Sequence, residues 1–383
     1  MKLFFPVETD AAETRVALVP EVARKFADLG AEVLIESGLG KAIGCADAAY
    51  TDGGAAVAET AEAAYEAADA VLRLAVPAEA DIARLHKGQL HISYLDPFRR
   101  PELLLKLAGA GVSAVCMEMI PRTTIAQKMD ALSSQANLAG YAAVMAAAGR
   151  MDRIFPMMMT PAGTIPPAKV FIIGAGVAGL QAIATAKRLG ARVEAFDTRP
   201  VVAEQVRSLG ARFVEVDLGE TGQTSGGYAR ELTPEQLELQ RRAMAKHAAM
   251  ADVVITTAQV FGRPAPRILT REMVAAMKPG SIVVDMAVET GGNVEGSEPG
   301  REVDINGVRV LGPANLAGRV AADASLMYAS NLFNLVEHFW DREAKRLALK
   351  LEDEIMDGCL VTHEGAIRNE KLKALAEAEG SAK

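Results

Sequence analysis

The stretch FIIGAGVAGLQAIATAKRLGARVEAFDTRP, residues 171–200, reads as an apolar strand, a glycine turn, a helix and a second strand. Gly174, Gly176 and Gly179 have the spacing G-x-G-x-x-G directly after the first strand. Glycines at this spacing permit a tight turn, a close approach of the backbone to a pyrophosphate, and close packing of helix on strand. The stretch therefore predicts a dinucleotide-binding βαβ unit.

An acidic residue follows at the expected distance. Asp197 ends the second strand, where a carboxylate can accept hydrogen bonds from ribose hydroxyls. The same charge repels a 2′-phosphate, which favours NAD(H) over NADP(H). Arg199 leaves three alternatives open, because an arginine there can pair with a phosphate, stack on adenine or face solvent.

In four places, helix-like stretches end in a glycine that precedes an apolar run, as expected of a left-handed residue closing a helix before a strand. This alternation predicts a parallel α/β architecture. The glycines are Gly30, Gly111, Gly190 and Gly210. The expected strands lie at residues 1–6, 32–37, 70–76, 89–95 and 112–119, and at 169–173, 193–197, 212–217, 252–258, 281–287 and 308–313.

The two sets of strands predict two doubly wound, Rossmann-like domains with a ligand cleft between them. We expect residues 1–134 with 319–383 in one domain and 135–318 in the other. Two long helices, near residues 137–151 and 319–342, are expected to join them. A Gly-rich, charged segment at about 219–245 interrupts the second domain and is either a surface excursion or a mobile lid.

Composition excludes several classes of protein. With 383 residues, half of them apolar, the chain can bury full-sized cores. Its net charge of -8 offers no basic field for nucleic acid or anionic lipid. The start of the chain lacks a signal-peptide pattern, and residues 131–149 are too polar for a spanning helix. The three cysteines, which form no metal-ligand pattern and fit a reducing compartment, are Cys45, Cys116 and Cys359.

An ordinary dehydrogenase needs a group that moves a proton alongside the hydride. None of the five histidines follows a strand end beside an acid, so each is expected to be a surface or packed residue. The remaining polar concentration is a loop at residues 120–133, which can hold a carboxamide and orient a ring. An alternative is a polar cap on the following helix, with Ser133 or Ser134 as N-cap. The loop's candidate residues are Arg122, Gln127, Asp130 and Ser133.

Over nearly its whole length the sequence resembles the NAD(H)-binding component, the alpha-1 subunit, of proton-translocating NAD(P) transhydrogenases. The resemblance implies that the loop residues named above contact the nicotinamide ring. It also implies a mobile loop that closes over the nucleotide through Tyr228, beside Gly227. The stretches that carry it are TRVALVPE, IPRTTIAQKMDALSSQANLAGY, RIFPMMMTPAGTIPPAKVFIIGAGVAGLQ, SGGYARE, KPGSIVVDMAVETGGN and RVAADAS. The implied pyrophosphate and adenosine contacts, besides the fingerprint glycines, are Val177, Ala178, Asp197, Thr198 and Arg199, with Gln259 lining the pocket.

The resemblance further implies partners. NADP(H) would be bound by a second subunit, and a membrane-spanning subunit would translocate protons. Hydride would pass directly between two nicotinamides, so no acid or base is needed at the site. The family implies a homodimer, placed in the cytoplasm and attached peripherally to the inner membrane through the partner subunits.

Two rival functions remain open. The sequence is also similar to alanine dehydrogenases, which carry a substrate-binding lysine and a catalytic histidine at positions that here hold Ala75 and Asp96. Arg15, matching their carboxylate-binding arginine, is retained, but transhydrogenases share it. The second rival is an NAD(H)-binding module without catalysis.

Overall fold

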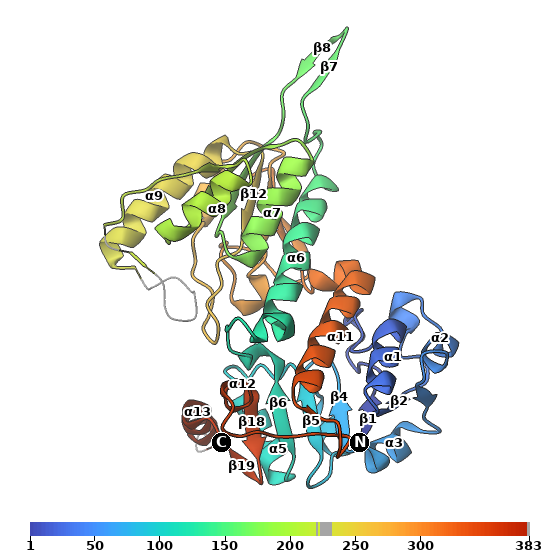
Figure 1. Ribbon diagram of the computed structural model, residues 1–383. Coiled ribbons are helices and arrows are strands. Elements are labelled where there is room, and N and C mark those ends of the chain that lie inside the picture. Colours follow the sequence, from blue (N-terminus) through green and yellow to red (C-terminus); the bar gives the residue numbers. More distant parts are fainter. Residues whose placement is uncertain (220, 223–231, 381–383) are drawn as a thin grey trace. The chain divides into compact units, whose positions relative to one another are not determined.

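The computed structural model describes residues 1–219, 221–222 and 232–380, and it divides into two compact units (Figure 1). Unit 1 comprises Met1–Gln135 and Gly318–Lys383, and unit 2 comprises Ala136–Ala317. The chain enters unit 2 within helix α6 (Ala131–Ala148). It returns to unit 1 in the short 3-10 helix η6 (Ala317–Val320), immediately before the long helix α11 (Ala321–His338).

Unit 1 is built on an eight-stranded sheet in the order β19-β18-β6-β5-β4-β1-β2-β3. The first six strands along the chain pair in parallel, whereas β18 and β19 add an antiparallel edge. The C-terminal segment therefore completes the sheet of the N-terminal half. The strands are β1 (Lys2–Phe5), β2 (Glu32–Ile35), β3 (Ala56–Val57), β4 (Ala70–Leu72), β5 (Leu90–Ser93), β6 (Ser113–Cys116), β18 (Leu360–His363) and β19 (Ala366–Ile367).

Helices cover both faces of this sheet and bury two apolar clusters against it. Pro20 and Pro101 begin α1 and α5, where a missing backbone N–H costs nothing. On one face Phe26 of α1 packs edge-on against Phe333 of α11. The remaining elements are α1 (Pro20–Asp28), α2 (Asp47–Thr51), α3 (Ala61–Ala67), α4 (Glu79–Ile82), α5 (Pro101–Gly109), α12 (Glu354–Cys359), α13 (Glu370–Gly380), the 3-10 helices η1 (Lys41–Ile43), η2 (Met117–Met119) and η3 (Ala126–Met129), and the ribbon β16 (Trp340–Asp341) with β17 (Arg346–Leu347).

Unit 2 has a seven-stranded sheet in the order β11-β10-β9-β12-β13-β15-β14. All neighbours pair in parallel except β14 and β15. A separate hairpin, β7 (Met158–Thr160) with β8 (Gly163–Ile165), pairs with no other described strand and projects from the unit (Figure 1). The sheet strands are β9 (Lys169–Ile173), β10 (Arg192–Phe196), β11 (Arg212–Phe213), β12 (Val253–Thr256), β13 (Ile282–Asp285), β14 (Arg301–Ile305) and β15 (Val308–Gly312), and the helices are α7 (Val177–Arg188), α8 (Ala203–Ser208), α9 (Pro234–Met250), α10 (Arg271–Ala275), η4 (Pro200–Val202) and η5 (Val288–Thr290).

The predicted α/β class with doubly wound parallel sheets is confirmed. All four glycines expected to close helices have positive φ: 93° at Gly30, 70° at Gly111, 89° at Gly190 and 77° at Gly210. Among the described residues, no helix combines the length and apolar character that crossing a membrane requires.

The two sheets share one connectivity. Numbered along each unit, their parallel strands lie in the order 3-2-1-4-5-6, so the direction of winding reverses between the first and fourth strands. In unit 1 this point lies between β1 and β4, and in unit 2 between β9 and β12. Ligands of such sheets bind beyond the carboxyl ends of these strands.

Candidate nucleotide-binding site

The reversal point of unit 2 holds the glycine turn. Gly174 has φ +100°, and a Cβ there would lie 2.4 Å from the Thr257 Oγ1 beyond β12. That hydroxyl donates to the Gly174 carbonyl oxygen at 3.1 Å and ties the two strand ends together. A Cβ on Gly179 would lie 1.9 Å from the same carbonyl oxygen, so α7 packs directly on the turn.

The middle glycine leaves the turn open to a ligand. Gly176 is the N-cap of α7, and the nearest atom to a Cβ there would be a guanidinium nitrogen of Arg199, 4.0 Å away. The amides of the first turn of α7, beginning at Val177 and Ala178, are thus presented beside a backbone with no side chain. Unpaired amides at a helix N-terminus attract anions, so this cradle fits a pyrophosphate.

Asp197 lies at the end of β10, beside the turn, and its side chain is 6% exposed. One carboxylate oxygen accepts from the backbone N–H of Ala175 at 2.8 Å and the other from the backbone N–H of Arg199 at 2.9 Å. The Arg199 guanidinium adds Nε to one oxygen and a terminal nitrogen to the other, both at 2.9 Å. These hydrogen bonds raise the pKa of Arg199. Thr198, between the pair, is half-buried.

The loops that follow β12 and β13 are joined by residues that sequence reasoning missed. Asn293 is fully buried, and its side chain bonds both the N–H and the carbonyl of Ala258, at 3.0 and 2.8 Å. Asp285 accepts from the backbone N–H groups of Asn293 and Val294, both at 3.1 Å. Gln259, which is exposed, donates to the Met286 carbonyl at 3.1 Å. The signal available in the sequence was the TGGN run, whose two glycines both have positive φ.

A further glycine outside the fingerprint supports the cradle. Gly140 lies on α6, and a Cβ there would meet the Ala178 carbonyl oxygen at 2.2 Å. The close approach of α6 to the start of α7 within unit 2 therefore requires glycine at this position.

The polar loop in unit 1 caps the helix that follows it, through a residue other than the two expected. Asp130 immediately precedes α6, and its carboxylate accepts from the Ser133 backbone N–H at 2.9 Å and from the Ser133 hydroxyl at 2.6 Å. Asp130, rather than Ser133 or Ser134, thus caps α6. Arg122 and Gln127 are exposed on the same loop, and the Gln127 carbonyl accepts from the Asp130 N–H at 3.3 Å.

The reversal point of unit 1 is filled by an ion-paired cluster. Arg73, which follows β4, is 0% exposed. It bonds Glu8 beyond β1 at 3.1 Å, and it pairs with Asp81 of α4. Glu8 also accepts from the Leu74 N–H at 2.6 Å. Burial raises the pKa of Glu8, and Arg73 opposes that rise.

Two other features of unit 1 bear on catalysis. Arg15 donates Nε and one terminal nitrogen to Glu13 at 2.8 and 2.7 Å, and the other nitrogen to Gln135 at 2.9 Å. It is therefore already paired with a carboxylate. His91 is the one buried histidine of the five, and burial lowers its pKa to about 3, which keeps it neutral.

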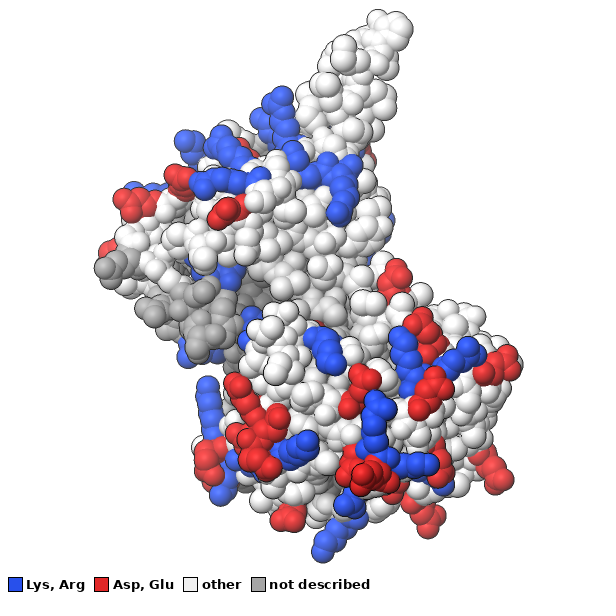
Figure 2. Space-filling view, in the orientation of Figure 1, with Lys and Arg blue, Asp and Glu red and all other residues white. Residues whose placement is uncertain are grey.

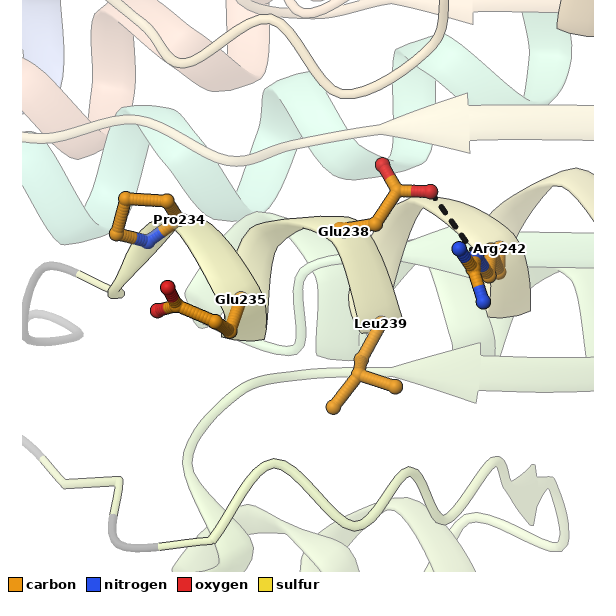
Figure 3. Close-up of a pocket in the computed structure, with 5 residues that line it drawn as sticks. All are labelled: Pro234, Glu235, Glu238, Leu239 and Arg242. Atoms are coloured by element: carbon orange, nitrogen blue, oxygen red, sulfur yellow. Dashed lines mark hydrogen bonds and ion pairs between the residues drawn. The ribbon is translucent and has the colours of Figure 1, made fainter.

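The predicted lid residues Tyr228 and Gly227 lie outside the described residues. The charged part of that segment forms helix α9, where Thr233 accepts from the Gln236 N–H in a capping box. A shallow pocket runs along α9, lined by Pro234, Glu235, Glu238, Leu239 and Arg242, with Glu238 and Arg242 paired at 3.0 Å (Figure 3). None of the predicted site residues lines it.

Two family descriptions match the chain. "Alanine dehydrogenase/PNT, N-terminal domain" covers residues 4–139, and "Alanine dehydrogenase/PNT, C-terminal domain" covers residues 143–370. The chain belongs to the alanine dehydrogenase/PNT family. The resemblance seen in the sequence is thereby confirmed.

Relatives with the transhydrogenase name are more similar than the alanine dehydrogenases. The first portion of the split NAD(P) transhydrogenase subunit alpha of Rhodospirillum rubrum is 46% identical over 374 residues, 96% of this chain and 97% of that protein. The crystal structure of transhydrogenase from Sinorhizobium meliloti superposes with a TM-score of 0.87 at 46% identity, covering 96% of this chain and all of that one. The alanine dehydrogenase of Halomonas elongata is 28% identical over 99% of this chain and 97% of its own.

Proposed function

We propose that this chain is the NAD(H)-binding component of a proton-translocating transhydrogenase, and that it acts only with partner subunits. The observation that carries the proposal is the near full-length similarity to the Rhodospirillum rubrum subunit. The geometry agrees, because unit 2 provides a nucleotide cradle at the reversal point of its sheet.

Unit 2 supplies the binding residues. The cradle of Gly174, Gly176 and Gly179 with the first turn of α7 fits the pyrophosphate. Asp197 and Thr198 are assigned to the adenosine ribose, and Gln259 to the pocket wall. The bound nucleotide supplies a nicotinamide carbon that gives or takes a hydride.

We assign the loop of Arg122, Gln127, Asp130 and Ser133 to the nicotinamide end of the nucleotide. Its task is positioning, since hydride transfer between two rings depends on their approach to about 3–3.5 Å. The cap on α6 fixes Asp130 and Ser133 relative to each other. Tyr228, with Gly227, is assigned to the closing loop that excludes water.

The partners follow from the transhydrogenase assignment. A second subunit holds NADP(H), and hydride passes directly between NADH on this chain and NADP+ on that subunit. A membrane-spanning subunit carries out proton translocation, and this chain attaches to it peripherally at the cytoplasmic face of the inner membrane. Nucleic acid is not a partner, given the net charge of -8.

We further propose a homodimer in which the β7–β8 hairpin contacts a second copy. Residues 156–166 are all exposed, with Met159 73% exposed. Four of them are large and apolar: Met157, Met158, Met159 and Ile165. Figure 2 shows this projection free of charged side chains. Exposed apolar surface of this kind marks an interaction site. Sedimentation equilibrium should give a dimer for the native chain and a monomer for the Met158→Lys, Met159→Lys variant.

The rival alanine dehydrogenase activity is disfavoured by two positions. Ala75 and Asp96 hold neither the lysine nor the histidine, whereas Arg15 is shared by both kinds of enzyme and does not discriminate. The third possibility, a binding module without catalysis, predicts NADH binding and no transfer under any condition.

The test is an absorbance assay of hydride transfer from NADH to a thionicotinamide analogue of NADP+. The chain is assayed alone, with an NADP(H)-binding transhydrogenase subunit, and with alanine and NAD+. Transfer only in the mixture supports the proposal. Turnover of alanine by the lone chain would establish the rival enzyme. NADH binding without hydride transfer in any of the three assays would favour the binding module.

A further inference from the structure

We propose that Arg199 is a specificity-determining residue that competes with the nucleotide's ribose for Asp197, weakening NAD(H) binding and reducing discrimination against NADP(H). The inference rests on the proposed NAD(H) site in unit 2. It predicts that Arg199 lowers the affinity for NAD(H), whereas a direct ligand of the nucleotide would raise it.

The first step concerns the capacity of Asp197. A carboxylate offers about four acceptor positions, two on each oxygen. Each oxygen of Asp197 already accepts one backbone N–H and one guanidinium N–H, all at 2.8–2.9 Å. A ribose diol that binds Asp197 therefore has to replace bonds that the carboxylate already makes.

The second step identifies the bonds that give way. The two backbone donors, at Ala175 and Arg199, belong to the glycine turn and to the segment after β10, and they hold the carboxylate in place. The two guanidinium bonds come from a side chain with several rotatable bonds. The guanidinium is thus the group that a ribose displaces, and its bidentate, charge-assisted pairing opposes that exchange.

The third step concerns charge. Rejection of a 2′-phosphate depends on the negative charge of Asp197. A guanidinium paired with that carboxylate cancels much of the repulsion, and in this pairing one of its nitrogens lies beside the turn, 4.0 Å from the Cβ position of Gly176. Arg199 therefore makes the site more tolerant of NADP(H) than Asp197 alone would make it.

The experiment is a fluorescence titration of the full chain with NADH and with NADPH. Arg199→Met keeps an unbranched apolar stem and removes the donors. We expect the dissociation constant of NADH to fall by about 3- to 10-fold and that of NADPH to rise by a similar factor. Arg199→Lys, which keeps the charge but loses the fork, should give smaller changes in NADH affinity.

A matched control is Arg207→Met in the same unit. Arg207 forms an exposed ion pair with Glu215, and neither residue is a predicted site residue. It should leave both constants unchanged. Melting curves confirm that each variant is folded.

The outcomes separate the two claims. An unsubstituted chain that fails to bind NADH would overturn the proposed function and the competition together. NADH binding that is normal in the unsubstituted chain, but weaker or unchanged in Arg199→Met, would overturn the competition alone and make Arg199 a direct ligand or a bystander.

Discussion

The reversal points of the two sheets have the same connectivity but hold different kinds of residue. In unit 1, Glu8 after the first strand and Arg73 after the fourth meet in a buried ion pair that also takes in Asp81. In unit 2, the same positions hold the glycine turn and Thr257. At the closed edge, in unit 1, charged side chains pair with one another. At the open edge, in unit 2, the glycine turn presents backbone without side chains.

Topology sets where a site can form, and side chains decide whether it does. Buried charges that satisfy one another leave nothing to pair with a ligand. Glycines leave backbone N–H groups within reach of an anion. We therefore locate nucleotide phosphate binding in unit 2 and assign a structural role to the equivalent edge of unit 1.

The largest expected effect comes from opening the closed edge. Arg73→Met leaves Glu8 buried without its cation and leaves Asp81 with only Arg84, 3.8 Å away, and breaking such a pair costs about 3–5 kcal/mol of unfolding free energy. Because Arg73 holds down the pKa of Glu8, that pKa rises further in the variant. A raised folded-state pKa gives stability that is present at low pH and lost as pH rises, so the deficit in urea unfolding should be larger at pH 8 than at pH 5.

The control is Lys25→Met, on the surface of the same unit. Lys25 pairs with Glu21 at 2.9 Å and its side chain is 45% exposed, so the cost should stay below about 1 kcal/mol. Equal losses in the two variants, or a collapse of NADH affinity in folded Arg73→Met, would contradict a purely structural role for the cluster.

The next effect comes from filling the open edge. Gly179→Ala places a Cβ where the Gly174 carbonyl lies 1.9 Å away, and such overpacking costs about 1–3 kcal/mol. The turn must shift, so we expect NADH affinity to fall at least about 10-fold. Gly109→Ala in α5, with no atom within 4 Å of the new Cβ, should bind NADH normally. Calorimetric titration and thermal unfolding measure both; unchanged binding in Gly179→Ala would remove the turn from the site.

A smaller effect separates the two roles of Asp130. Asp130→Ala removes the cap of α6 and should cost about 1 kcal/mol, whereas Asp130→Asn keeps an acceptor oxygen and should cost less. If Asp130 also positions the ring, both variants slow hydride transfer in the reconstituted mixture. Transfer rates that track only the loss of stability would assign Asp130 to the cap alone.

The smallest effect concerns the reactivity of the three cysteines, all of which lie in unit 1. Burial raises the pKa of Cys359 to about 12 and that of Cys116, at the end of β6, well above its usual value. Cys45 is partly exposed. With iodoacetamide at pH 8 we expect Cys45 to react at least about 100-fold faster than the other two, without change in NADH affinity. Rapid labelling of Cys116 in folded protein would show that this edge opens.

Local signals in the sequence predicted much of the fold. Glycine spacing located the cradle, and the four helix-closing glycines were correct because their backbone conformation is a property of one residue and its neighbours. Apolar runs located the parallel strands except the two-residue strand β3, which pairs with β2. The antiparallel strands β14, β18 and β19 were not predicted, since an edge strand depends on a partner distant in sequence, as β18 does on β6.

The site was less accessible to sequence reasoning. The pairing of Arg73 with Glu8 joins residues 65 positions apart, and no local pattern announces it. The need for glycine at Gly140 depends on the approach of α6 to Ala178. Whether Asp130 or Ser133 caps α6 depends on a helix boundary that shifts by three residues, and both residue types cap well.

The most direct test of the account follows a labelled hydrogen. NADH deuterated at C4, in each of its two stereochemical forms, is incubated with the chain, NADP+ and an NADP(H)-binding transhydrogenase subunit, and the NADPH formed is analysed by mass spectrometry. The account predicts that one of the two forms delivers its deuterium to NADPH completely and that omission of either protein abolishes transfer. Hydrogen derived from solvent in the NADPH, or transfer by this chain alone, would contradict it.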